Sequence, residues 1–337
     1  MWRRTFLLFL LGLLLVGIIL YLVNPFRVWD EMQKIPFKFL LILLLLQTMI
    51  MINSAVKWRI ILMNSRISIK NILLATLVGY LVNNITPVGL AGGEPVRAYL
   101  LSRAENIRFS TAVSSVIVDL FLEIFPIFIL ILISIAMILI GGESETLAII
   151  LGIIAVALLT LFIITVILMT HKNLILILTQ RFLDILIKIP ILSDYAKRKR
   201  ADIDGVSKRF KKAMKEYMMD AKILFFGTTI SIVGWILRFL RVYLAFIALG
   251  YSIPLGTLII VETAVLAISF VPIFPGALGI WEGSSIGLFV LFGVDGAVAT
   301  AATIIDRTFF YILPSIVGAF SSIYCGINLS NIMQSKK

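Results

Sequence analysis

The chain has 337 residues, of which 61% are hydrophobic and only 14% charged, a composition that excludes an ordinary soluble domain. Its single cysteine excludes an internal disulfide, and its single histidine excludes a cluster of His and Cys ligands for zinc or iron. Because the sequence has no P-loop run of the form G-x-x-x-x-G-K-S/T, that route to nucleotide hydrolysis is excluded as well. We therefore expect no metal and no cofactor.

Apolar stretches near or above about 18 residues predict an all-α polytopic membrane protein with one membrane domain spanning residues 1–337. The first stretch resembles a signal peptide, but no small-residue cleavage site follows it, so we expect an uncleaved helix. Two other stretches, 71–108 and 254–292, are interrupted by prolines and glycines. In chain order, the predicted full transmembrane helices are 5–23, 36–56, 111–140, 147–170, 223–249 and 298–325.

The charges of the links between these helices predict their orientation. Most Lys and Arg residues fall in 57–70, 97–108, 171–222 and the two chain ends, so the positive-inside rule places these segments and both termini in the cytoplasm of a plasma membrane protein. The remaining links, which carry more acids than bases, are expected outside; they are 24–38, 141–146 and 293–297. The net charge of +12 then indicates orientation and anionic lipid rather than a nucleic acid partner.

The first interrupted stretch contains "ILLATLVGYLV", whose 11 residues cover about 16 Å, roughly half of the hydrocarbon core. The links on both sides of it are basic, so we interpret 71–108 as a re-entrant hairpin that enters and leaves on the cytoplasmic side. The alternative is one ordinary span over 71–90, which would export the arginines that follow. The residues predicted to break the helix are Pro87, Gly89, Gly92, Gly93 and Pro95.

The second interrupted stretch, "SFVPIFPGALGIWEGSSIGLFVLF", repeats this order of features. Glu94 follows Pro87 by seven residues and Glu282 follows Pro275 by seven, and an Asp inside the next span follows each Glu. This pattern predicts an inverted repeat of 36–140 and 223–325, which is typical of secondary transporters. The alternative is that Pro and Gly merely kink closely packed helices. The breakers predicted in the second hairpin are Pro272, Pro275, Gly276 and Gly279.

Ten ionisable side chains lie within the predicted membrane region, where an uncompensated charge costs at least about 2.5 kcal/mol. One group is expected at mid-depth to the outer half, and we interpret it as substrate-binding: Arg238, Arg241, Arg307, Glu282, Asp306 and Glu262. The other is expected toward the inner half, in coupling or gating of protons or ions: Glu94, Arg97, Asp119 and Glu123.

Arg238 and Arg241 are three residues apart and should share a helix face, where with Arg307 their guanidinium forks suit a phosphate head group. The alternative is that these arginines only neutralise neighbouring acids in a structural network. Asp119 and Glu123 also share a face and have no obvious partner in the sequence, so they could carry protons or pair with Arg97.

Two loop features are weaker signals. The segment 171–222 is basic and partly apolar, which predicts an amphipathic stretch on the inner leaflet with its basic cluster against anionic lipid. Asp30 and Glu31 could serve as glycosyltransferase carboxylates, although charged loop residues are more often simply solvated.

The stretches "NNITPVGLAGGEPVRAYLL", "SFVPIFPGALGIWEGSSIGLF" and "DRTFFYILPSIVG" resemble the membrane region of lysylphosphatidylglycerol synthases, also called multiple peptide resistance factors, and related stand-alone flippase-like proteins. The resemblance covers essentially the whole chain. It implies the part associated with moving lipid between leaflets, without the soluble synthase domain, and it does not identify the lipid.

These features favour a protein that is not an enzyme but an ATP-independent flippase or scramblase for an anionic phospholipid or polyprenyl-phosphate-linked lipid. A carrier of a soluble anion or ion is the first alternative. The second is a lipid-dependent glycosyltransferase that uses Asp30 and Glu31, but its largest outer loop would be only about 15 residues long. Membrane lipids are the expected partners, and a homodimer is left open.

Overall fold

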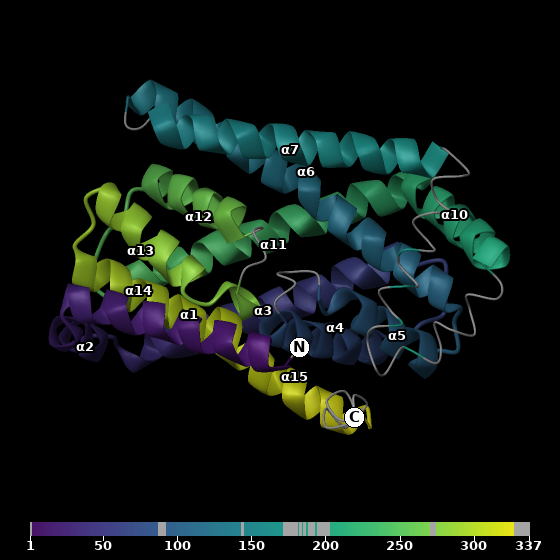
Figure 1. Ribbon diagram of the computed structural model, residues 1–337, viewed down its shortest axis with the longest axis horizontal. Helices are drawn as coiled ribbons and strands as arrows, with labels where there is room; N and C mark the ends of the chain where they lie inside the picture. The colour runs from purple at the N-terminus through teal and green to yellow at the C-terminus, as the bar shows by residue number, and fades with distance from the viewer. Residues whose placement is uncertain are drawn as a thin grey trace.

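A computed structural model describes residues 2–86, 92–142, 145–170, 181, 184, 187, 193, 203–269 and 274–326, and its regular elements are all helices (Figure 1). This confirms the predicted all-helical class. The helices, in chain order, are α1 (Trp2–Val23), α2 (Pro25–Gln33), α3 (Phe37–Ile61), α4 (Ile69–Ile85), α5 (Glu94–Ala104), α6 (Phe109–Gly141), α7 (Glu145–Thr170), α10 (Ile203–Met219), α11 (Ala221–Ala248), α12 (Leu255–Ser269), α13 (Ile280–Leu291), α14 (Gly296–Arg307) and α15 (Leu313–Tyr324).

Within the described residues, four helical stretches are long and apolar enough to cross a membrane. They are α3, α6, α11 and the continuous run Gly296–Tyr324, in which the π-helical segment Thr308–Ile312 joins α14 to α15. The bent pair α1 and α2 would add a fifth, with an angle of 85° between its two parts. The predicted total of six full spans and two hairpins stays a prediction.

The connections predicted to be cytoplasmic meet at one end of the molecule. Glu105, just after α5, accepts hydrogen bonds from the Ser68 N–H at 3.0 Å and from the side-chain amide of Asn71 at 2.7 Å. Lys70 donates to the Tyr324 hydroxyl at the end of α15 at 2.8 Å. The stretch from α4 to α5 therefore leaves and returns at the same end, as a re-entrant hairpin requires.

Two connections predicted to lie outside meet at the opposite end, where Arg27 on α2 forms an exposed ion pair of 3.1 Å with Asp295 before α14 (Figure 1). The Asp295 carboxylate also accepts hydrogen bonds from the Ala297 and Val298 N–H groups and so caps α14. Slight burial opposes ionisation, but these hydrogen bonds and Arg27 together lower the pKa of Asp295 below its usual value.

The first hairpin is held by a close approach of its two legs. A Cβ atom on Gly93 would lie 2.0 Å from the Gly79 carbonyl oxygen, so only glycine allows α5 to begin this near α4. The Gly93 N–H donates to the Asn83 side chain at 2.5 Å. Gly92 is equally confined by Thr86.

The other predicted breakers of this hairpin have different outcomes. Pro95 lies in the first turn of α5, where proline is tolerated, so it helps to start the second leg rather than to break a helix. Pro87 and Gly89 lie outside the described residues.

The second hairpin breaks between α12 and α13 at a 3₁₀ turn, Pro275–Ala277. Gly276 and Gly279 have positive φ angles of 56° and 82°, which favour glycine. The Glu282 carboxylate accepts a hydrogen bond from the Gly279 N–H at 2.7 Å, which closes a capping box at the start of α13. The fourth predicted breaker, Pro272, lies outside the described residues.

Apolar side chains form the contacts between these helices and also cover much of the outside. Trp58 packs fully buried in the cluster that α3 to α6 share with α10, and Phe246 packs fully buried in the cluster around α11 to α14. Large apolar residues remain exposed along α1, α3, α6 and α7. A surface of this kind is stable in lipid rather than in water.

The two ends of the molecule generate a labelling prediction. In a Cys325→Ser background we place single cysteines at Arg66, Ala104, Ser144 and Gly205, and we expect an impermeant maleimide to label intact cells only at position 144. Each position should react after permeabilisation, which controls for accessibility. Labelling at 104 with protection at 66 would mean that the first hairpin crosses the membrane and would contradict the topology.

Candidate functional site

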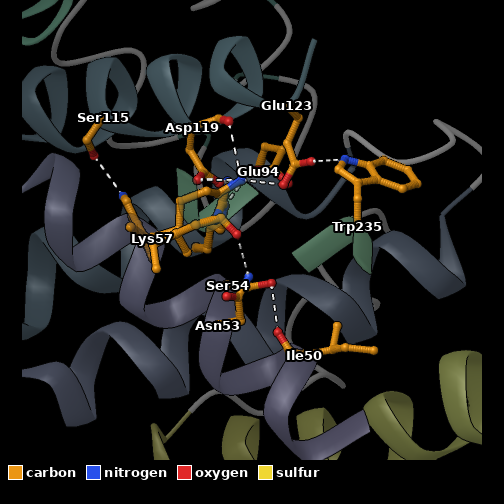
Figure 2. A network of polar contacts seen from close by, with 12 residues as sticks. Ile50, Asn53, Ser54, Lys57, Glu94, Ser115, Asp119, Glu123 and Trp235 are labelled. Atoms are coloured by element: carbon orange, nitrogen blue, oxygen red, sulfur yellow. Dashed lines mark hydrogen bonds and ion pairs between the residues drawn. The ribbon is translucent and has the colours of Figure 1, made fainter. Parts of the chain in front are cut away.

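The first of two polar networks is built around a buried lysine that α3 supplies. Lys57 forms ion pairs with Asp119 on α6, at 3.0 Å, and with Glu123 one turn further along α6. The contact with Asp119 Oδ1 lacks hydrogen-bond alignment. Figure 2 shows the three side chains turned toward one another, with Trp235 of α11 donating its indole N–H to Glu123 at 2.9 Å.

Arg97 joins the first hairpin to this network. Its guanidinium forms an ion pair of 2.7 Å with Asp119 and a second one with Glu94, which stands at the start of the same short helix α5. The guanidinium also lies over the Trp58 ring, 4.7 Å from the centroid. Trp58 in turn donates to the Ser115 hydroxyl at 2.9 Å. Three helices, α3, α5 and α6, therefore share one charged network.

Arg238 lies at the edge of the first network and is its most accessible cation. It forms a long ion pair of 3.6 Å with Glu123, and 27% of its side chain is exposed, against 4% for Lys57. Its guanidinium stacks 4.6 Å from the Trp235 ring centroid. Because Glu123 also has Lys57 and Trp235 as partners, Arg238 is the cation whose loss or displacement would disturb the network least.

The second network has a similar plan on the other half of the chain. Arg241 on α11 forms a buried ion pair of 2.7 Å with Asp306 on α14 and donates to the Gln47 side chain on α3 at 2.5 Å. Arg307 forms a buried ion pair of 2.6 Å with Glu282 on α13. The first pair joins α11 to α14, and the second joins α14 to the second hairpin.

Arg307 also reaches the break of the second hairpin. It donates to the Gly276 carbonyl oxygen at 3.0 Å, and its guanidinium lies 4.5 Å from the Tyr311 ring centroid. Tyr311 belongs to the π-helical segment Thr308–Ile312. Such segments within α-helices frequently occur at functional sites.

The two hairpins meet at Asn84, near the end of α4. The Asn84 side chain donates to the Tyr311 carbonyl oxygen at 3.1 Å and to the Ser315 hydroxyl at 2.8 Å, and the Tyr311 hydroxyl donates back to the Asn84 carbonyl oxygen at 2.9 Å. A Cβ atom on Gly276 would lie 2.9 Å from that same oxygen. The end of α4 and the break of the second hairpin therefore both lie against the π-helical segment, next to the second network.

The structure corrects how the sequence grouped these residues. Asp119 and Glu123 do not lack partners, because Lys57 contacts both. Arg238 and Arg241 bind different acids, Glu123 and Asp306 respectively, and so belong to different networks. The substrate-binding and coupling roles assigned to these residues stay predictions.

Two central residues were missed by sequence reasoning. Lys57 was assigned to a cytoplasmic link, but α3 continues to Ile61 and buries it. A signal was present: Lys57 precedes Arg241 by 184 residues, close to the 187 between Asp119 and Asp306. Gln47 lies in an otherwise apolar run and carried no comparable signal.

Asp30 and Glu31, the candidates for glycosyl transfer, lie on α2 at the end that holds Arg27 and Asp295. Asp30 is exposed, and Glu31 forms an ion pair of 2.6 Å with Lys34. This arrangement is that of an ordinary solvated helix face.

The buried position of Lys57 generates a stability prediction. Lys57→Met should lower the free energy of unfolding by about 3 to 5 kcal/mol, because Asp119 and Glu123 would lose a buried cation. Unfolding in detergent, followed by circular dichroism, measures the loss. Adding Glu123→Gln should restore part of it.

Lys34→Met is the matched control, since its exposed pair with Glu31 should contribute no more than about 1 kcal/mol. Equal stability of the two lysine variants would show that Lys57 does not hold the network.

Comparison with known proteins relates the whole chain to membrane proteins. Residues 7–318 match the family model described as the lysylphosphatidylglycerol synthase TM region. A UPF0104 membrane protein of Methanothermobacter thermautotrophicus is 28% identical over 98% of this chain and 95% of its own. One from Pyrococcus horikoshii is 26% identical over 94% and 95%. No solved structure matches significantly. The chain therefore belongs to the family of the lysylphosphatidylglycerol synthase transmembrane region.

Proposed function

We propose that the protein moves an anionic phospholipid or a polyprenyl-phosphate-linked lipid between the two leaflets without ATP. The observation that carries the proposal is the meeting of two broken hairpins at Asn84, Gly276 and Tyr311, beside buried guanidinium groups. Broken helices that meet among charged groups form the substrate sites of secondary transporters. Membership of the lysylphosphatidylglycerol synthase transmembrane family is consistent with a lipid substrate.

An inverted repeat of 36–140 and 223–325 is part of this proposal. In each half, a cation on the first span pairs with an Asp on the last span: Lys57 with Asp119, and Arg241 with Asp306. In each half, a Glu in the first turn of the second hairpin leg binds an Arg. These correspondences support two related halves that could rock against each other around the contact between Asn84 and Tyr311.

Arg238 is the residue that we propose contacts the head group first. Its side chain is 27% exposed and its guanidinium lies on the Trp235 ring, so part of the fork remains accessible. A lipid phosphate could therefore bind the exposed part of this fork. Arg241 and Arg307 would hold the head group deeper.

We further propose that α10 rests on the inner leaflet. Its apolar residues Ala213, Met214 and Tyr217 are buried in the cluster of α3 to α6, while the lysines Lys208 and Lys212 are exposed. The helix contains five basic residues and two acids, and this excess of positive charge favours binding to anionic lipid. The adjoining residues 171–202 lie almost entirely outside the described part of the chain.

The proposal is tested in reconstituted vesicles that carry a fluorescent lipid quenched by dithionite. We expect the protein to speed leaflet exchange of an anionic phospholipid or a polyprenyl phosphate above the rate in empty vesicles. Exchange no faster than in empty vesicles, for both lipid classes, would remove the proposal. Uptake of a soluble anion that added lipid does not compete away would support the carrier instead.

The role of Arg238 is tested separately. Arg238→Gln should slow exchange severalfold with almost unchanged thermal stability, because Glu123 keeps Lys57 and Trp235 as partners. Arg238→Lys should restore exchange only in part, since it keeps the charge and loses the bidentate fork. Unchanged exchange in Arg238→Gln would rule out a head-group contact at this residue.

Arg241 provides the contrast. Arg241→Gln should lower the free energy of unfolding by about 3 to 5 kcal/mol, because it leaves Asp306 without its buried cation. The double variant with Asp306→Asn removes both charges and should recover folding. Recovery of exchange as well would show that Arg241 is structural, whereas folding without exchange would support a head-group role.

A further inference from the structure

One carboxylate of the second network has no cation of its own. Glu262 lies in the middle of α12, the first leg of the second hairpin, and is partly buried. Each of the other five acids in the two networks forms at least one ion pair: Glu94, Asp119, Glu123, Glu282 and Asp306. In the described part of the chain, no side chain forms a hydrogen bond or ion pair with Glu262.

The charged groups around Glu262 are already bound to other side chains. From α11 it faces Arg241, whose guanidinium is bonded to Asp306 and Gln47. From α14 it faces Asp306 itself, a like charge. The cation on α14, Arg307, forms an ion pair with Glu282.

The remaining helices that pack against α12 bring no free cation. From α13 comes Glu282, an acid, and from α6 come Asp119 and Glu123, which Lys57 binds. The only ionisable group in the described part of α7 is Glu145, at its first residue. The undescribed stretches 87–91 and 270–273 contain no Lys, Arg or His in the sequence.

The balance of charges in the two networks also indicates Glu262. The first network has three bases and three acids, whereas the second has Arg241 and Arg307 against Asp306, Glu282 and Glu262. An ionised carboxylate without a partner is costly at membrane depth, and binding one proton removes both the charge and its repulsion from Asp306. A proton on Glu262 would remove its charge and its repulsion from Asp306, and no helix would have to move.

We propose that Glu262 is a proton-binding site through which proton uptake and release are coupled to lipid movement. The proton bound by Glu262 would leave the second network neutral, and its loss would add a negative charge beside Arg241 and Asp306. A phosphate held by Arg241 or Arg307 is repelled by that negative charge, so head-group binding and Glu262 protonation should favour each other. The coupling, but not the proton site, rests on the proposed function.

Proton binding is measured on the purified protein without any transport. Infrared difference spectra between about pH 5 and about pH 9, a range that lies above the ordinary carboxyl pKa values of about 4, should contain the C=O band of a protonated carboxylic acid. Glu262→Gln should remove this band. Glu145→Gln, at the exposed start of α7, is the matched control and should leave it in place.

Coupling is measured as lipid exchange in vesicles over the same range of pH. The rate should change severalfold in the unaltered chain and in Glu145→Gln, and should be independent of pH in Glu262→Gln. If Glu262→Gln does not fold, Glu262→Asp supplies the answer, because moving the carboxyl group by one methylene should shift the midpoint of the infrared band.

The outcomes separate the two proposals. A band that persists in Glu262→Gln, or a midpoint that Glu262→Asp leaves unchanged, would overturn the proton site. The same dependence of exchange on pH in Glu262→Gln would overturn the coupling. A band that depends on Glu262 in a protein without lipid exchange would support the proton site and contradict the proposed function.

Discussion

The compensation of charge in a medium without water is the interaction on which the rest of this structure depends. Each major buried ion pair joins two different helices: Arg97 on α5 with Asp119 on α6, Arg241 on α11 with Asp306 on α14, and Arg307 on α14 with Glu282 on α13. Apolar side chains are as stable against lipid tails as against another helix, so they determine only weakly which helices become neighbours. The buried ion pairs instead determine which helix faces come together. They do so among α3, α5 and α6, and again among α11, α13 and α14.

The same constraint explains the polar residues beside the helix breaks. A break exposes backbone amide groups at a depth where no lipid atom can bond them. Asn83 accepts from the Gly93 N–H, and Glu282 accepts from the Gly279 N–H. Asn84 is bonded through its side chain and its carbonyl oxygen to the π-helical segment. The two asparagines before the first break therefore stabilise irregular backbone, and they tie one hairpin to the other.

Local features of the sequence were enough to predict most of the helices and both breaks. Apolar length sets where a span lies, and proline and glycine set where it stops, so 71–108 and 254–292 were found without any knowledge of contacts. Pairing was not predictable in this way. Arg238 and Arg241 lie about 60° apart around a helix, yet their long side chains diverge to Glu123 on α6 and Asp306 on α14. Lys57 was misplaced because the apolar run ends near it while the helix continues.

Two networks that are nearly neutral cannot attract a phosphate by net charge alone, so in the function we propose a head group would have to replace an acid that is already present. The replacement costs least where the acid keeps other partners. Glu123 has this property, since it holds Lys57 and Trp235 as well as a long contact to Arg238. A phosphate arriving at Arg238 would exchange one oxygen ligand for another and leave no buried charge alone. Deeper in the protein, Arg241 and Arg307 each hold one acid tightly. In the function we propose, a head group would reach them only after the hairpins move apart, and such a movement is what alternating access between the two leaflets requires.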